Sequence, residues 1–177
     1  MNRIILITGK KNSGKTSFLK YFINTILRKR GLTPAGFIAE GKPNSGRKSE
    51  FELVNIHHHE KKRLCTGVPK KGWINMGKFY FDPEGLSFGD HLLNNIPGNA
   101  NPVIIDEFGQ LELSGKGWKK AVDTLMDGND RTMIITVRKD VLAAVVVYFN
   151  GNEVHVFNID MNNRESLAAE ITKLLPG

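Results

Sequence analysis

The chain has 177 residues, the length of a single globular domain. Hydrophobic residues make up 40% of it and charged residues 24%, which excludes an intrinsically disordered protein because enough apolar surface is present to form a core. The 25 basic and 18 acidic residues give a formal net charge of +7. This surplus favours an anionic ligand, and both nucleotides and nucleic acids meet that condition.

The cysteine content and the apolar segments bear on the compartment in which the chain works. Cys65 is the single cysteine, which excludes an intrachain disulfide and a metal cage of thiolates and fits a reducing compartment. Residues 4–7 are too short an apolar run for a signal segment, and no stretch approaches the roughly 18 apolar residues of a membrane span. We therefore expect a cytoplasmic protein without a membrane partner.

The first part of the chain predicts a buried strand followed by a helix. Residues 4–8 form an apolar, mostly β-branched run, as expected for a strand that is buried on both faces of a parallel sheet. Apolar residues at helical spacing follow, and a basic triplet and Gly31 then mark the end of this helix. The apolar stripe consists of Phe18, Leu19, Phe22, Ile23, Ile26 and Leu27.

The next segment predicts a second strand and then an antiparallel hairpin. Residues 36–40 form the strand, and residues 51–56 and 63–66, separated by a polar stretch, form the hairpin. Between strand and hairpin, residues 41–50 combine glycine, proline, asparagine and serine with several charges, so we expect this segment to be flexible.

Helices and strands alternate over the rest of the chain. We expect helices over residues 90–96, 118–126 and 140–149 and strands over residues 103–105, 132–137 and 154–159, with a final helix that begins at Asn162 or Asn163. Residues 140–149 are predicted helical despite their valines because a strand there would break the alternation. The pattern predicts an α/β fold, a three-layer sandwich whose mainly parallel sheet contains an inserted antiparallel hairpin.

A phosphate-binding loop follows the first strand. Residues 9–16 match the pattern G-x-x-x-x-G-K-[ST] without a mismatch, between a buried strand and an amphipathic helix. The glycines let successive backbone N–H groups point at the phosphates, and the helix adds the positive end of its dipole. Lys15 can reach the β- and γ-phosphates, and the Thr16 hydroxyl can ligate Mg²⁺. The predicted binding residues are Gly9, Lys10, Lys11, Asn12, Ser13, Gly14, Lys15, Thr16 and Ser17.

Two carboxylates stand at the end of the strand over residues 103–105. Asp106 can hold Mg²⁺ opposite Thr16, because ligands gather at the carboxyl edge of open α/β sheets. Glu107 can orient and deprotonate an attacking water. Together with the loop, this pair predicts one P-loop NTPase domain over residues 1–177, with Lys15 and Glu107 as its catalytic residues and a nucleoside triphosphate as its ligand.

The chain resembles a family of small nucleoside-triphosphatases that was first described in thermophiles and has a human cancer-related relative. The resemblance is carried by the phosphate loop and by residues 36–40, 77–82 and 106–113. It implies an added strand between the loop strand and the acidic strand, and slow Mg²⁺-dependent hydrolysis with little base preference. Lys15, Thr16, Asp106 and Glu107 match the family in residue type.

The chain departs from this family at two places, one near Arg47 and one at Arg138. Arg47 and Phe51 match an arginine and a phenylalanine of the family, but the glycine that accompanies them is absent. Arg138 follows the strand over residues 132–137, where the family often has a histidine. We expect Arg138 near the phosphates, either as a sensor of the γ-phosphate or as a surface arginine.

Two other functions fit the phosphate loop. The loop also resembles that of the GTP-binding adapter proteins of molybdopterin-guanine-dinucleotide synthesis. Residues 137–140 share only the aspartate with the guanine-reading pattern N-K-x-D, however. A small phosphotransferase is the other alternative; it would need an acceptor pocket and a mobile basic lid, and residues 61–71 hold only one arginine, Arg63.

Histidine and lysine clusters suggest weaker alternatives. Three adjacent histidines, residues 57–59, favour a solvated turn over a metal site, because neighbours in a strand point to opposite faces. The basic groups at residues 61–63, 70–71 and 119–120 lie on separate elements without interleaved aromatic residues, so a nucleic-acid surface is not favoured. Trp73 is expected to be a packed or hinge aromatic residue, and Cys65 to pack within the hairpin.

Overall fold

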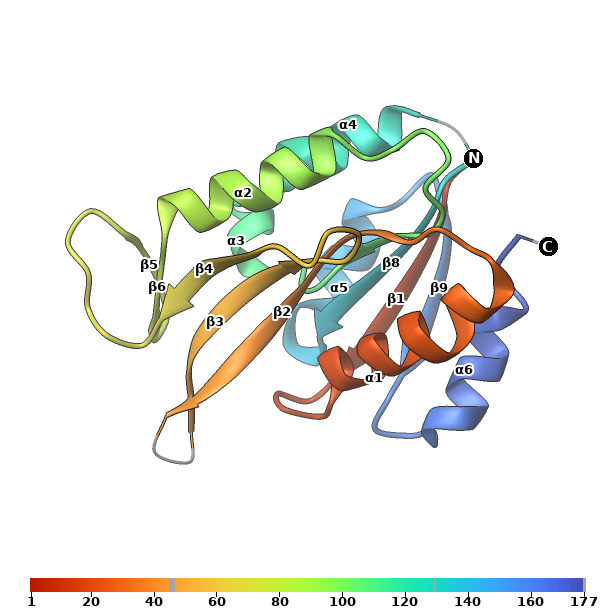
Figure 1. The fold of residues 1–177 in the computed structure, drawn as a ribbon, viewed down its shortest axis with the longest axis horizontal. Helices are drawn as coiled ribbons and strands as arrows, with labels where there is room; N and C mark the ends of the chain where they lie inside the picture. Colours follow the sequence, from red (N-terminus) through yellow and green to blue (C-terminus); the bar gives the residue numbers. More distant parts are fainter. Residues whose placement is uncertain (45–46, 129, 177) are drawn as a thin grey trace.

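The computed structural model describes residues 1–44, 47–128 and 130–176. Within them, nine strands form one sheet in the order β5-β6-β4-β3-β2-β7-β8-β1-β9 (Figure 1). The strands are β1 (Arg3–Gly9), β2 (Ala35–Asn44), β3 (Arg47–Asn55), β4 (Lys61–Thr66), β5 (Ile74–Met76), β6 (Phe79–Phe81), β7 (Val103–Ile105), β8 (Thr132–Arg138) and β9 (Glu153–Asn158). Strands β2, β7, β8, β1 and β9 run parallel, and β3, β4, β6 and β5 extend the sheet with antiparallel pairs.

Helices cover both faces of this sheet (Figure 1). The α-helices are α1 (Lys15–Phe22), α2 (Pro83–Asn94), α3 (Gln110–Leu113), α4 (Lys119–Asp127), α5 (Leu142–Tyr148) and α6 (Arg164–Thr172). A π-helical segment, η1 (Ile23–Leu27), and a 3₁₀ segment, η2 (Arg28–Arg30), prolong α1, and a further 3₁₀ turn, η3 (Lys139–Val141), precedes α5. The described helices do not include one that is long and apolar enough to cross a membrane.

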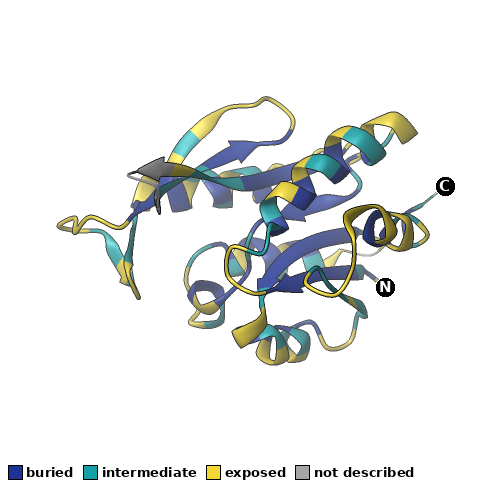
Figure 2. Cartoon of the chain, turned by 90° about the horizontal axis from the view of Figure 1, so that it is seen from below, coloured by how far each residue is buried: buried dark blue, intermediate teal, exposed yellow. Residues whose placement is uncertain are grey.

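The core consists of two layers that meet the sheet from opposite sides. In β1, Ile5 and Ile7 pack with α1, η1 and α6, whereas Ile4 and Leu6 pack with α2, α4 and α5. All four side chains are fully buried, because in a strand successive residues point to opposite faces and both faces are covered here. Figure 2 shows the buried strands between partly exposed helices. The predicted three-layer α/β sandwich is confirmed.

Most predicted elements are confirmed. The apolar stripe of the first helix is buried at Phe18, Leu19 and Phe22, and Gly31 ends the helical segment with a positive φ of 72°. The hairpin of β3 and β4, the helix over residues 140–149 and the final helix with Asn163 as its N-cap are also present. The strand that the family resemblance implied lies where expected, since β8 separates β1 from β7.

The prediction of a helix over residues 90–96 is wrong in its bounds. Helix α2 begins at Pro83, where the Asp82 carboxylate accepts a hydrogen bond from the Glu84 N–H at 3.1 Å. Aspartate at the N-cap followed by proline at the first helical position is a favourable start, because proline lacks an N–H that would need a partner. The helix ends at Asn94, so Ile96 lies outside it.

The sequence patterns missed three short elements. Strands β5 and β6 and helix α3 have three or four residues each, too few for apolar periodicity to identify them. Within residues 41–50, β2 extends to Asn44 and β3 begins at Arg47, and the expected flexibility of this segment stays a prediction. Residues 45 and 46 of that segment lie outside the described residues, as does the side chain of Arg47.

Candidate active site

Three residues shape the loop between β1 and α1. Two have a positive φ, and at the third there is no room for a Cβ. Gly14 has a φ of 90° and Asn12 a φ of 59°, so the chain turns through the left-handed region twice before the helix starts. A Cβ on Gly9 would lie 2.5 Å from Ser13 Oγ and 2.6 Å from Ile159 Cγ2. A residue with a Cβ at position 9 would therefore push Ser13 and Ile159 away, and glycine lets the loop pack closely against both.

Lys15 lies at the centre of this loop. Its side chain is only 7% exposed, and its Nζ donates hydrogen bonds to the carbonyl oxygens of Lys10 at 3.0 Å and Gly9 at 3.4 Å. These bonds hold a positive charge inside the ring of loop backbone. An ammonium in this position is placed to bind phosphate oxygens.

Asp106 follows β7 and is buried, with 3% of its surface exposed. Its carboxylate accepts hydrogen bonds from Thr136 Oγ1 at 2.6 Å, from Thr16 Oγ1 at 2.8 Å and from the Ala39 N–H at 3.0 Å. Burial raises the pKa of Asp106, although these hydrogen bonds and the nearby Lys15 oppose the rise. The bond to Thr16 joins the acidic strand end directly to the phosphate loop.

Glu107 lies beside Asp106 at the same edge of the sheet. Burial and the neighbouring Asp106 carboxylate raise its pKa to about 7, against the opposing charges of Lys15 and Arg138. Its side chain is 39% exposed, and this exposed part lines a cavity. A carboxylate with a pKa near neutrality, reachable from a cavity, is suited to accept a proton.

Besides Lys15, three further cations line this edge of the cavity: Lys11, Lys78 and Arg138. Arg138 Nε lies 3.9 Å from Glu107 Oε1 and also donates a hydrogen bond to Asp140 at 3.1 Å. Desolvation lowers the pKa of Lys11, and the adjacent positive charges of Lys78 and Arg138 lower it further. Positive groups from the loop, from the β5–β6 turn and from the end of β8 therefore converge, as a polyanion would require.

The cavity at this edge has a volume of about 430 Å³ and two chemically distinct parts. We call the first part the phosphate half; it is lined by Lys11, Asn12, Ser13, Gly14, Lys15, Thr16, Ser17, Asp106, Glu107 and Arg138. We call the second part the apolar half; it is lined by Phe51, Leu64, Cys65, Met76, Phe79, Phe81 and Trp118. Burial raises the pKa of Cys65 to about 12, so its thiol acts as a small neutral side chain.

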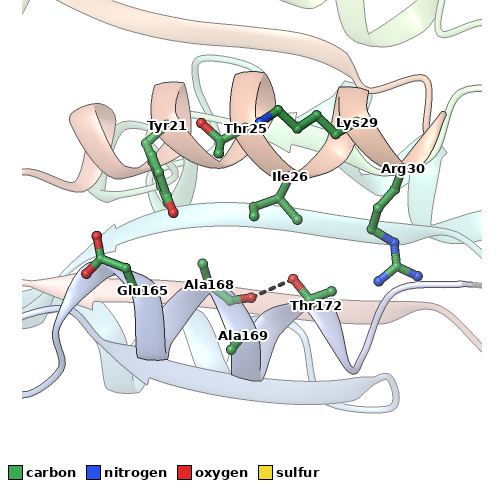
Figure 3. A pocket seen from close by; sticks show the side chains of 9 residues that line it. All are labelled: Tyr21, Thr25, Ile26, Lys29, Arg30, Glu165, Ala168, Ala169 and Thr172. Carbon is green, nitrogen blue, oxygen red and sulfur yellow. Dashed lines mark hydrogen bonds between the residues drawn. The ribbon is translucent and has the colours of Figure 1, made fainter.

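Another concavity, of about 450 Å³, lies between α1 with its η segments and α6 (Figure 3). It is lined by Tyr21, Thr25, Ile26, Lys29, Arg30, Glu165, Ala168, Ala169 and Thr172. None of the predicted site residues is among these. The two concavities are similar in size, so it is the chemistry of the lining that distinguishes the phosphate half as the candidate active site.

Comparison with known proteins agrees with this geometry. A model of an NTPase family matches residues 4–172. The chain belongs to this family. Nucleoside-triphosphatase THEP1 of Thermotoga sp. (strain RQ2) is 28% identical over 172 residues, covering 97% of this chain and 94% of that protein. The protein of the same name from Archaeoglobus fulgidus is 29% identical over 176 residues, covering 98% and 99%.

The fold of the chain is also that of a solved relative. The solution structure of a human cancer-related nucleoside triphosphatase superimposes with a TM-score of 0.76 at 24% identity. The match covers 97% of this chain and 96% of that one. The α/β fold of the chain is therefore shared with that structure over nearly its whole length.

Not all residues predicted for the site of this NTPase line the cavity. The lining includes residues 11–17, Asp106 and Glu107, but not Gly9 or Lys10. Gly9 acts through the close packing of the loop. The backbone N–H of Lys10 donates a hydrogen bond to Asp160 at 2.9 Å, which fixes the start of the loop, while the Lys10 side chain is exposed.

Sequence patterns missed other residues of the cavity. Lys78 comes from the turn between β5 and β6, and the only signal for it was the family resemblance over residues 77–82. Glu112 is 2% exposed, and its carboxylate accepts a hydrogen bond from the Gly109 N–H at 2.9 Å. Burial raises the pKa of Glu112 to about 8 in spite of that hydrogen bond.

The weaker sequence signals lie away from the phosphate half. The three histidines form an exposed turn between β3 and β4, and the described residues contain no cluster of three His, Cys, Asp or Glu side chains that could hold a metal alone. The Trp73 ring lies under the Arg63 guanidinium, 4.8 Å from its carbon, as a partly exposed packed aromatic residue. Cys65 is buried in β4, as expected.

Proposed function

We propose that the chain is a Mg²⁺-dependent hydrolase that converts nucleoside triphosphates to diphosphates and phosphate. The observation that carries the proposal is the junction of loop and acidic strand. Thr16 donates a hydrogen bond to Asp106 there, Lys15 is held by the carbonyl oxygens of Gly9 and Lys10, and Glu107 lines the same cavity. Membership of an NTPase family supports the reaction class.

Binding of the triphosphate is assigned to the loop. The backbone N–H groups of residues 11–16 and the N-terminal end of α1 would hold the α- and β-phosphates. Lys15 would exchange its bonds to loop carbonyls for bonds to the β- and γ-phosphates, because an anionic oxygen is a stronger acceptor than a peptide carbonyl. Lys11, Lys78 and Arg138 would neutralise the remaining charge.

The residues present fit a magnesium ion. Thr16 Oγ1 and Asp106 Oδ2 are hard oxygen donors 2.8 Å apart, the ligand type that Mg²⁺ prefers. They make only part of an octahedral shell, so the ion is expected to arrive with the nucleotide and to keep several waters. When bound, it supplies charge neutralisation on the β- and γ-phosphate oxygens.

Glu107 would act as the base. Its carboxylate orients a water toward the γ-phosphorus and accepts its proton as the new phosphorus–oxygen bond forms. The bond between the γ-phosphorus and the bridging oxygen breaks, and the nucleoside diphosphate leaves with the electron pair. Lys15 stabilises the charge that develops on the transferred group, a contribution of preorganised electrostatics.

We further propose a broad base preference and a cytoplasmic location. The phosphate half would contact the part that all nucleoside triphosphates share, and the guanine-reading pattern N-K-x-D is absent from residues 137–140. The one cysteine is a free, buried thiol, which suits a reducing compartment.

Phosphate release tests this function. The parent protein should release phosphate from ATP, GTP, CTP and UTP with Mg²⁺, and EDTA should abolish the release until Mg²⁺ is restored. Lys15→Ala should lower turnover on the order of 10³-fold, because it removes a charge at the transferred group. Lys29→Ala, at an exposed lysine of η2 that does not line the cavity, is the control. Full activity in EDTA or in Lys15→Ala would contradict the proposal.

A further inference from the structure

The apolar half of the cavity has no role in binding a triphosphate or in activating water. Phosphates and Mg²⁺ need charged and polar partners, whereas the seven residues that define this part are aromatic, aliphatic or sulfur-containing. Lys78, Gln110 and Glu112 also line the cavity. The rings of Phe51 and Phe79 meet edge to face, 5.4 Å apart, and form a continuous wall from β3 to β6. An apolar wall beside the reacting groups stabilises a ligand only if that ligand has an apolar body.

The order of the strands places the apolar half beyond the γ-phosphate. The loop backbone holds the α- and β-phosphates, and Lys15 holds the β- and γ-phosphates, so the chain of phosphates runs from the loop toward Asp106. The apolar wall comes from β3, β4, β5 and β6, all on the far side of β7 from β1 (Figure 1). A nucleoside is attached at the α-phosphate, so it points back toward β1 and β9.

The cavity also extends beyond the residues that would hold the triphosphate. Its volume of about 430 Å³, within the range of sites for small organic molecules, includes both halves, and seven of its lining residues belong to the apolar half. The apolar half also has a polar group without a partner. Trp118 Nε1 is buried in a residue that is 3% exposed, and it has no hydrogen-bond partner among the described residues. A ligand atom that accepts a hydrogen bond would satisfy it.

We propose that the apolar half binds a small alcohol with a flat apolar body, which takes the γ-phosphoryl group in place of water. The proposal rests on the phosphate site described above. The alcohol oxygen bonds to the γ-phosphorus, and the bond from phosphorus to the bridging oxygen breaks. The diphosphate leaves with that electron pair, and the hydroxyl proton passes to Glu107. The products are a phosphate monoester and a nucleoside diphosphate.

The partition between transfer and hydrolysis tests the proposal. ADP and inorganic phosphate are measured in parallel from Mg²⁺ and ATP, with benzyl alcohol, 3-pyridinemethanol or glycerol added. Hydrolysis alone yields the two products in equal amounts. We expect the two aromatic alcohols to give ADP in excess of phosphate, with the matching monoester visible by ³¹P NMR. Glycerol, which has hydroxyl groups but no apolar body, should leave the two amounts equal.

Variants locate the transfer in the apolar half. Phe79→Ala should reduce the ADP excess about tenfold, because the lost contact with the ring is worth roughly 1.5 kcal/mol or more. Met76→Ala, on the edge strand β5, should reduce it in the same direction and serves if Phe79→Ala does not fold. Phe157→Ala removes a half-buried phenylalanine from β9 and should leave the partition between transfer and hydrolysis unchanged.

Two results would overturn the proposal. The first is equal ADP and phosphate with every alcohol while hydrolysis proceeds normally. The second is a nucleobase in the apolar half, seen as weaker ATP binding but unchanged binding of inorganic triphosphate in Phe79→Ala. Neither result touches the hydrolytic function, whose failure would instead appear as the absence of phosphate release from the parent protein.

Discussion

The parallel and antiparallel parts of the sheet contribute different things to one cavity. Lys15, Asp106 and Glu107 follow the carboxyl ends of parallel strands β1 and β7, where α/β proteins commonly bind ligands. The antiparallel strands β3 to β6 contribute mainly apolar side chains and one cation, Lys78. We propose that the parallel part carries the phosphate chemistry, while the antiparallel part determines which further molecule meets it.

The largest expected effect comes from replacing the two carboxylates of the parallel part, Asp106 and Glu107, one at a time. Glu107→Gln keeps the shape of the side chain but removes the proposed base, a role worth about 10²–10⁴ in rate. Triphosphate binding should persist, because the loop is intact and a charge that repels phosphate is gone. Asp106→Asn should weaken the binding of Mg²⁺-nucleotide as well as turnover, because it removes the proposed magnesium ligand. Single-turnover hydrolysis and equilibrium nucleotide binding, measured on both variants, separate these effects.

A matched variant in the antiparallel part sharpens this result. Phe81→Leu alters the apolar wall but no group that touches phosphate, so its hydrolysis should change by less than about threefold, in line with the small cost of an apolar swap. Hydrolysis by Glu107→Gln at the parent rate would show that Glu107 is not the base. A loss of hydrolysis rate in Phe81→Leu as large as in Glu107→Gln would show that the antiparallel part also takes part in hydrolysis.

The second effect concerns the junction between the two parts, at β2. Gly36 has a φ of 105°, and a Cβ there would lie 2.1 Å from the carbonyl oxygen of Ile104 in β7. Gly36→Ala should therefore lower the free energy of unfolding by about 3 kcal/mol or more, since the clash is with backbone that cannot yield cheaply.

Gly31→Ala is the control for this clash. Gly31 also has a positive φ, 72°, but a Cβ there meets nothing within 4 Å, so only backbone strain of about 1 kcal/mol remains. Urea denaturation of both variants measures the difference. Equal destabilisation by the two substitutions would mean that the close contact between β2 and β7 does not require glycine at residue 36.

The same division explains what the sequence could and could not predict. The loop and the acidic pair were predictable because their chemistry fixes residue types at short spacings beside a buried strand. Lys78 and Phe79 could not be placed, because β5 and β6 are too short for periodicity and join the sheet only through the pairing of β6 with β4 and of β5 with β6. Glu112 had a weak signal, an acidic residue three positions after Gly109, whose N–H it caps.

A smaller effect tests the buried carboxylate of Glu112 in α3. The pKa of Glu112 is raised from 4.5 to about 8, so the folded chain binds this proton more tightly than the unfolded chain does. The associated stability is complete below about pH 4.5 and is lost as the pH rises through about 8. Glu112→Gln removes this loss and still offers an oxygen to the Gly109 N–H.

We therefore expect the parent and Glu112→Gln to differ little at pH 5, and the variant to be more stable at pH 9 by on the order of 3 kcal/mol. Thermal or urea unfolding across this range provides the measurement. Glu165→Gln, at an exposed glutamate of α6, should not change the pH profile. A parent profile that is flat between pH 5 and 9 would exclude a buried, protonated Glu112.

The smallest expected effect compares a helix cap from each part. Asn163 caps α6, beside the parallel strands, by accepting a hydrogen bond from the Ser166 N–H at 2.8 Å. Asp82 caps α2, directly after antiparallel strand β6, and also accepts a hydrogen bond from Arg63 Nε at 3.2 Å. Replacing either by alanine removes a partner of a helix N–H, which costs about 1 kcal/mol.

Asp82→Ala should lower the free energy of unfolding more than Asn163→Ala does. Asp82 is only 7% exposed and also holds β4 against α2 through Arg63, whereas Asn163 is exposed. Asn163→Ser, which keeps a capping oxygen, should restore most of the loss at α6. Hydrogen exchange adds the spatial readout: Asp82→Ala should speed exchange in β4 and β6, while Asn163→Ala should affect α6 alone. If Asp82→Ala leaves β4 and β6 as protected as in the parent, the antiparallel part is held by its apolar wall and not by this polar anchor.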